Sequence, residues 1–130
     1  MFLFLLGLIT GFVATNLKNP RMGLAAHLEG VMNGAFLIGA GLIWNDLRLL
    51  SKIKIAAYWT LIYGTFANWL VTLSAAYLGA YAMSPVTGHG FMATPQQENL
   101  VNGGFITVGV TMVFSVAVMT YGLRGRMKTP

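Results

Sequence analysis

The sequence predicts an all-α integral membrane protein, a bundle of four transmembrane helices that forms one domain over residues 1–130. Hydrophobic residues make up 56% of the chain and charged residues 8%, against about 25% charged residues in soluble domains. The apolar residues fall in four long runs that polar connections separate. A chain with so few charges cannot cover a water-facing surface, so we expect lipid to cover it.

The four runs are expected to span the bilayer at about residues 1–15, 23–44, 53–83 and 99–123. The first run is short against the roughly 20 residues that a span needs, and a signal peptide is the rival interpretation. It has no positively charged start and no convincing small-residue cleavage motif, which favours a span. The third run is long enough to tilt or to extend past the membrane. The one long loop covers residues 84–98 and holds two prolines and two glycines.

Basic residues predict the orientation. The second connection and the C-terminal tail together hold six of them, and the first connection holds two: Arg48, Lys52, Lys54, Arg124, Arg126 and Lys128 against Lys18 and Arg21. Cytoplasmic loops are enriched in Lys and Arg, so we expect a bacterial-type inner (plasma) membrane with both termini cytoplasmic. These residues form no stripe, so nucleic acid is not an expected partner. The chain has no cysteine, which excludes disulfides and thiolate chemistry.

Polar side chains concentrate in the second run, where His27, Glu29 and Asn33 lie within two helical turns. Ionisable groups inside membrane spans are rare and usually functional. Helical spacing stacks His27 above Gly34, with Gly30 beside them. Imidazole binds iron and a glycine strip leaves room for a planar group, which suggests haem. In the alternative, His27 hydrogen-bonds a neighbouring helix and the glycines only pack.

Glu29 and Asn33 are four residues apart and share a different face of this helix. In one interpretation Glu29 accepts a proton or orients a bound amine or cation. In the other it lies near the membrane surface, close to the helix start, and pairs with Lys18 or Arg21.

Two further polar residues lie in the third run. Asn68 is deep in apolar sequence and needs a partner, which is a substrate, Asn33 or a backbone carbonyl. Tyr63 either donates a proton or packs. His89 is expected to be solvated in the loop. The hydroxyls of the fourth run are expected to bond back to their own helix, at Thr107, Thr111 and Ser115.

Segments 19–34, 57–59 and 63–69 resemble the hydroxylaminobenzene mutases, and the likeness extends over all four runs. More distantly, Ala-His, five residues, Asn-Gly and a later Ala-Asn are similar to styrene oxide isomerase. The resemblance implies a homotrimer of four-helix subunits with haem b between them. His27 matches the axial ligand of the haem iron, and Asn33 and Asn68 match pocket residues. Glycines Gly30 and Gly34 are then expected beside the haem, and Arg21 or Lys18 at its propionates.

Departures from the isomerase favour the mutase. Thr72 stands where the isomerase has a pocket tyrosine, and Glu29 and Gly30 replace other residues. The implied reaction rearranges hydroxylaminobenzene, or another aryl hydroxylamine, to a 2-aminophenol, with ferric haem acting as a Lewis acid. Glu29 and Tyr63 join the two asparagines as candidate catalytic residues. An epoxide-to-aldehyde isomerase is the nearest alternative.

Two alternatives come from other classes. A haem-carrying membrane anchor needs a second axial ligand, for which Met32 or Met112 is available. A small multidrug transporter also has four helices and one membrane glutamate, and Glu29 then exchanges protons for cations.

Overall fold

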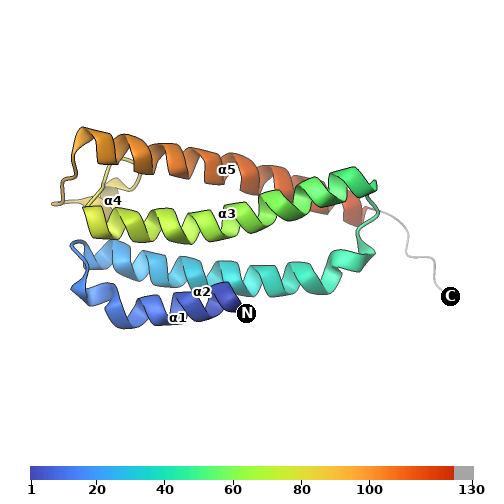
Figure 1. Ribbon diagram of the computed structural model, residues 1–130, viewed down its shortest axis with the longest axis horizontal. Helices are drawn as coiled ribbons and strands as arrows, with labels where there is room; N and C mark the ends of the chain where they lie inside the picture. The colour runs from blue at the N-terminus through green and yellow to red at the C-terminus, as the bar shows by residue number, and fades with distance from the viewer. Residues whose placement is uncertain (125–130) are drawn as a thin grey trace.

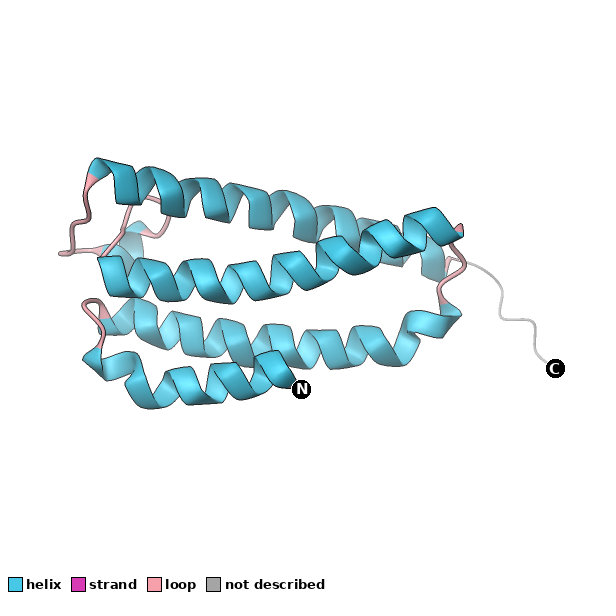
Figure 2. Cartoon of the chain, viewed as in Figure 1, coloured by secondary structure: helices cyan, strands magenta, loops and turns pink. Residues whose placement is uncertain are grey.

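The structure, a computed structural model, describes residues 1–124, and the prediction of an all-α fold is confirmed for them. The helices are α1 (Phe2–Val13), α2 (Pro20–Ile43), α3 (Ser51–Leu78), α4 (Pro85–Gly88) and α5 (Pro95–Leu123), with 3-10 turns at Ala14–Asn16 and Trp44–Asp46. Helices α1, α2, α3 and α5 lie lengthwise, as Figures 1 and 2 show. The first two connections are short, and the third, residues 79–94, contains α4. Arg126 and Lys128, which contributed to the predicted orientation, lie outside the described residues.

Three helical segments are long and apolar enough to cross a membrane: Pro20–Asp46, Ser51–Leu78 and Pro95–Leu123. The helical segment Phe2–Asn16 is apolar but shorter. A fourth span and a trimer therefore stay predictions.

The helices start and end where local caps place them. The Asn19 side chain accepts a hydrogen bond from the backbone nitrogen of Met22 at 3.1 Å, and Pro20 occupies the first turn. Helix α2 thus begins at residue 20, three residues before the predicted start. Glu29 lies nine residues inside it, about 14 Å along the axis at 1.5 Å per residue.

The third and fourth predicted runs also shift for local reasons. Gly79 adopts φ 77°, the left-handed conformation that ends α3 at Leu78 rather than near residue 83. Thr94 and Gln97 form a reciprocal capping box that starts α5 at Pro95 instead of residue 99.

The helices pack in chain order: α1 on α2, α2 on α3, and α3 on α5. In Figure 1, α1 and α5 lie at opposite edges of the molecule. Two apolar clusters hold the packing together. One is near the loop end, with Met22, Ala75, Ala76, Ala80 and Val101. The other is near the opposite end, with Ala40, Leu47, Leu61 and Met119. The polar residues of the second run lie between these clusters.

Candidate functional site

The structure brings together Glu29, Asn33 and Asn68 between α2 and α3. The Asn33 amide Nδ2 donates to Glu29 Oε2 at 3.2 Å, and Asn68 Nδ2 donates to the same oxygen. Asn33 Nδ2 also lies 3.4 Å from the carbonyl oxygen of Thr65. Asn33 is buried, whereas Glu29 and Asn68 are half-buried. We call these three residues the carboxylate cluster.

The carboxylate cluster answers two questions that the sequence left open. The partner of Asn68 is Glu29, which was not among the partners expected for it. Glu29 in turn is held by two amides instead of pairing with a basic side chain. A carboxylate in apolar surroundings needs such donors. Both amides bond Oε2, so Oε1 is the carboxylate atom that can accept a hydrogen bond from a bound molecule.

His27 lies on the other side of α2, against α1. Its Nδ1 is 2.8 Å from the carbonyl oxygen of Gly7. A carbonyl only accepts, so Nδ1 carries a hydrogen, and in the neutral ring the lone pair is then on Nε2. The ring lies over Gly11, where a Cβ would come within 2.9 Å of Nδ1. Two residues along a helix turn by about 200°, so His27 and Glu29 point to opposite sides of α2.

The glycine strip of α2 is covered by α1. A Cβ at Gly30 would lie 2.9 Å from the backbone nitrogen of Gly7, and one at Gly34 would lie 2.5 Å from the backbone of Phe4. Helix α1 thus occupies the room that the sequence left for a planar group beside these glycines. Their role in this structure is close helix packing.

Tyr63 and Arg21 lie apart from the carboxylate cluster. The Tyr63 hydroxyl is 2.9 Å from Thr107 Oγ1, so this side chain joins α3 to α5. The Arg21 guanidinium donates to the carbonyl oxygen of His89 and lies 5.6 Å from the centre of the Phe91 ring. Arg21 therefore contacts the loop that precedes α5.

Lys18, in the connection between α1 and α2, donates hydrogen bonds to this loop and to the end of α3. Lys18 Nζ donates to the carbonyl oxygens of Leu78 and Met92, both at 2.9 Å. The connection between α1 and α2 is thus hydrogen-bonded to the end of α3 and to the loop before α5. His89 is exposed in the loop, as expected.

The hydroxyls of α5 bond back to their own helix, as predicted. Thr111 Oγ1 and Ser115 Oγ each lie 2.8 Å from the carbonyl oxygen four residues earlier. Thr107 Oγ1 lies 2.8 Å from the carbonyl oxygen of Gly104.

Sequence reasoning missed the residues of α1 that contact His27 and Trp69. Gly7 and Gly11 seat His27, and Thr10 Oγ1 accepts a hydrogen bond from Trp69 Nε1 at 3.0 Å. Two glycines four residues apart were the available signal, because that spacing allows close helix contact in membranes.

Among the described residues, His27 is the one histidine within a long helix, and it is not part of a complete metal site. Within residues 1–124, no three of the His, Cys, Asp and Glu side chains gather to hold a metal ion. A metal bound by His27 must therefore bring most of its ligands with it, as the iron of a porphyrin does.

Comparisons with known proteins match nearly the whole described chain. A family model for styrene oxide isomerase matches residues 1–124. Hydroxylaminobenzene mutase HabB of Ectopseudomonas oleovorans is 45% identical over 123 residues, 94% of this chain and 75% of that protein. Hydroxylaminobenzene mutase HabA of the same organism is 49% identical over 100 residues, 76% of this chain and 74% of that protein. No solved structure shows a significant match.

Proposed function

This chain belongs to the styrene oxide isomerase family, and we propose that it is an isomerase that rearranges hydroxylaminobenzene, or a related aryl hydroxylamine, to a 2-aminophenol. The two relatives named as hydroxylaminobenzene mutases support this substrate class. The observation that carries the proposal is the carboxylate cluster, because an anionic acceptor suits a substrate with N–H and O–H donors.

The mutase is favoured over the epoxide isomerase by Thr72. This residue occupies the position of the isomerase's pocket tyrosine, and its hydroxyl donates to the backbone carbonyl of Asn68 at 2.8 Å. That proton is committed to the helix, so Thr72 does not supply an acid for epoxide opening.

The reaction needs no oxidant or reductant. The N–O bond breaks with its electron pair on oxygen, a C–O bond forms at the ortho carbon, the ortho carbon loses a proton, and nitrogen gains one. Glu29 Oε1 accepts a hydrogen bond from the substrate N–H group. It then takes the proton from the ortho carbon and passes it to the nitrogen. Asn33 and Asn68 hold the carboxylate through Nδ2, and their amide oxygens orient the NH–OH group. The apolar clusters on both sides exclude water that would otherwise trap the ring.

The proposed cofactor is ferric haem b on His27. A ligating histidine usually donates its other ring N–H to a carbonyl or carboxylate, and the bond from Nδ1 to the Gly7 carbonyl has that form. Nε2 is then available to iron. When bound, ferric haem supplies a Lewis acid for the hydroxylamine oxygen.

The opposite directions of His27 and Glu29 support a site shared between copies. The body of α2, about 10 Å across, separates the two side chains within one chain. The proposed assembly is a homotrimer in which one copy supplies His27 and its neighbour supplies Glu29. The substrate then lies between two subunits.

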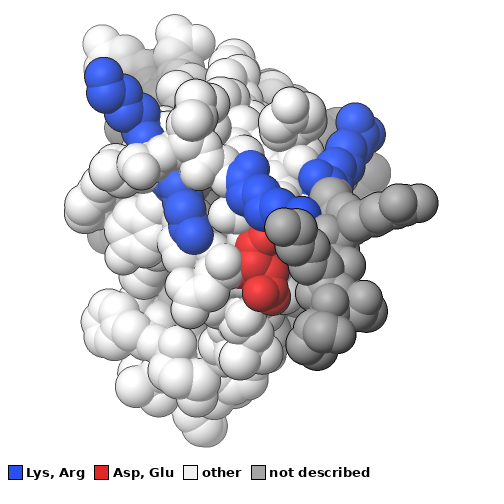
Figure 3. All heavy atoms as spheres, turned by 90° about the vertical axis from the view of Figure 1, so that its right-hand side faces the viewer, with Lys and Arg blue, Asp and Glu red and all other residues white. Residues whose placement is uncertain are grey.

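The proposed location is the plasma membrane, with both termini on the cytoplasmic side. The cytoplasmic side would be the end of the bundle that holds the connection between α2 and α3. The described basic residues there are Arg48, Lys52, Lys54 and Arg124. Figure 3 shows Lys and Arg side chains gathered on this face. Lys54 Nζ lies 5.9 Å from the centre of the Trp44 ring, an arrangement typical of the membrane interface.

The test is conversion of phenylhydroxylamine by detergent-purified protein without added reductant. We expect 2-aminophenol as product and a Soret band that disappears, with activity, in His27→Ala. Glu29→Gln should keep the Soret band and lower kcat by about 10²-fold, the usual contribution of a general acid–base group. Glu98→Gln is the matched control, because this carboxylate caps backbone nitrogens of the loop.

Different results overturn different parts of the proposal. Full activity in protein free of iron and porphyrin rules out haem, and absence of 2-aminophenol rules out the mutase. Colourless protein with proton-coupled cation uptake that depends on Glu29 would indicate a transporter. Haem reduction and reoxidation without any isomerisation would indicate an electron-transfer anchor.

A further inference from the structure

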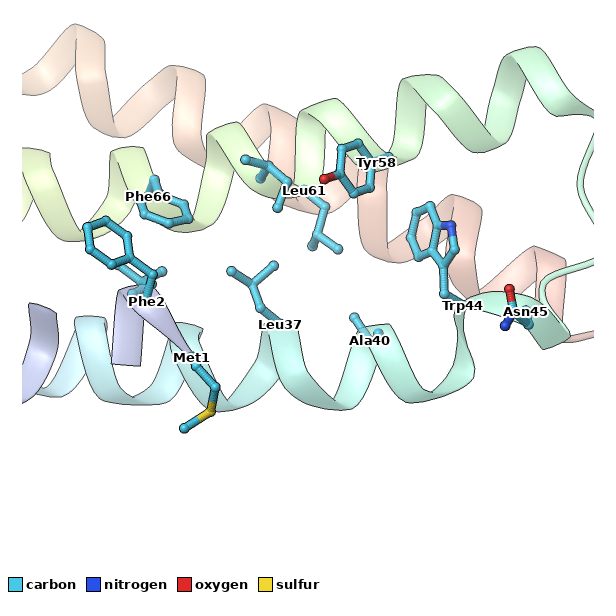
Figure 4. Close-up of a pocket in the computed structure, with 12 residues that line it drawn as sticks. Met1, Phe2, Leu37, Ala40, Trp44, Asn45, Tyr58, Leu61 and Phe66 are labelled. Atoms are coloured by element: carbon cyan, nitrogen blue, oxygen red, sulfur yellow. The ribbon is translucent and has the colours of Figure 1, made fainter. Parts of the chain in front are cut away.

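An apolar groove runs between α2 and α3 beyond the N-terminal end of α1. Helix α1 has 12 residues and α2 has 24, so α1 covers only part of the surface that α2 and α3 share. The groove has a volume of about 520 Å³, and Figure 4 shows the side chains around it. We propose that this groove binds the small aromatic substrate and leads it from the bilayer to the carboxylate cluster. The inference rests on the proposed function for its ligand class.

Aromatic side chains line the groove along its length. Phe2 and Phe66 stack with ring centres 6.4 Å apart, and Trp44 meets Tyr58 edge to face at 5.7 Å. Offset and edge contacts of this kind are the ones that a further aromatic ring prefers. Benzene fits a cavity of about 150 Å³, so 520 Å³ admits a substituted ring with room to move.

The inner end of the groove adjoins the carboxylate cluster. Leu37 lines the groove and lies one helical turn beyond Asn33 on α2. On α3, Ile62 and Phe66 flank Thr65, whose carbonyl oxygen is 3.4 Å from Asn33 Nδ2. The groove and the cluster therefore share the same two helices and differ by one turn along them.

A lipid acyl chain is the competing occupant of any lipid-facing groove. Ordering an acyl chain freezes many rotatable bonds, whereas a flat ring has few to lose. The aromatic lining favours the ring for the same reason that aromatic pairs favour each other. A small aromatic dissolves in the bilayer, so it reaches the groove laterally.

Two glycines of α2 provide matched variants. A Cβ at Gly41 or at Gly39 would meet no atom within 4 Å, so larger side chains fit at both positions. Gly41 lines the groove, whereas Gly39 is not among the residues around it. Gly41→Leu should raise KM for phenylhydroxylamine and lower kcat/KM by about tenfold, as blocking a binding pocket does. Gly39→Leu should stay within about twofold of the unaltered protein.

Binding is measured separately from turnover by fluorescence. Nitrobenzene, which the enzyme cannot rearrange, quenches tryptophan on contact, and Trp44 lines the groove. We expect saturable quenching in the unaltered protein and in Gly39→Leu, and its loss in Gly41→Leu. Trp44→Phe identifies the share of the signal that belongs to the groove.

The outcomes separate the groove from the proposed function. Saturable quenching in a protein that makes no 2-aminophenol would refute the mutase and leave an aromatic site without its reaction. Normal turnover without saturable quenching, or unchanged kcat/KM in Gly41→Leu, would refute the groove alone. Phospholipid that stays bound in native mass spectra of Gly39→Leu but is absent from Gly41→Leu would show an acyl chain as the occupant and overturn the proposal.

Discussion

His27 has its orientation set by two residues that lack side chains. The carbonyl of Gly7 accepts from Nδ1 at 2.8 Å, and Gly11 leaves the space that the ring fills. Partners of this kind fix the tautomer of a metal-binding histidine and commonly change metal affinity or activity 10–100-fold when altered. The chemistry proposed for one residue therefore depends on a neighbouring helix.

Gly11→Ala tests this dependence. The new Cβ would lie 2.9 Å from Nδ1, so the imidazole must move and its bond to Gly7 must weaken. We expect the haem to be retained with a shifted Soret band and an affinity about tenfold lower, as for other altered partners of metal-binding histidines. Absorption spectra and haem transfer to apomyoglobin measure both effects.

The control for Gly11→Ala is Gly103→Ala on α5. A Cβ at Gly103 meets no atom within 4 Å, so the haem spectrum should not change. Identical spectra and affinities in both variants would show that the contacts of His27 with Gly7 and Gly11 have no influence on the iron.

The sequence showed which polar residues stand out in apolar runs, but it did not show where these side chains meet. His27, Glu29 and Asn68 were identifiable because such side chains are costly in apolar sequence. The pairing of Asn68 with Glu29 depends on how α3 is rotated against α2, which hydropathy does not encode. Tyr63 was a candidate because its hydroxyl can donate a proton, yet it lies five residues before Asn68 on the helix and is turned toward α5.

Between elements, the contact of α1 with α2 depends on glycines on both helices. Gly7 and Gly30 approach so closely that neither position has room for a Cβ, and Gly34 meets the backbone of Phe4 in the same way. Hydrophobic burial does not hold helices together inside lipid, so packing at such contacts supplies much of the association.

Gly30→Ala should separate α1 from α2. The added methyl group would lie within 2.9 Å of the Gly7 nitrogen, which is backbone and cannot yield without moving the helix. Overpacking of this kind costs about 1–3 kcal/mol, so we expect thermal inactivation in detergent at a lower temperature. Gly109→Ala, where a Cβ meets no atom within 4 Å, should inactivate like the unaltered protein. Equal inactivation temperatures for the two variants would contradict the packing role.

The element boundaries show where hydropathy falls short. The apolar runs located the helices, but the ends came from caps that carry no hydropathy signal, such as Asn19 before α2 and Gly79 after α3. The shift at Asn19 has a functional consequence, because it places Glu29 deeper in the helix than a start at residue 23 implies.

At the scale of the whole molecule, the chain is an open row of helices with much apolar surface. Leu42 of α2 and Val113 of α5 are 81% and 71% exposed, so lipid or further copies must cover these faces. One copy also leaves its imidazole and its carboxylate on opposite sides of α2. The proposed assembly with neighbouring copies would both cover this surface and complete the proposed site.

Mixed oligomers of two inactive variants test this shared site. His27→Ala lacks the proposed iron ligand and Glu29→Gln lacks the carboxylate, so neither alone should exceed about a hundredth of the unaltered activity. If each site takes His27 from one copy and Glu29 from the next, random trimers of the two variants contain intact sites. An intact site takes His27 from a Glu29→Gln copy and Glu29 from a neighbouring His27→Ala copy. Every mixed trimer has one such site out of three, so the mixed species should have about a third of the unaltered activity. Co-expression with two different affinity tags and purification through both isolates the mixed species. A site built within one copy would leave these mixtures inactive, because every copy lacks one of the two groups.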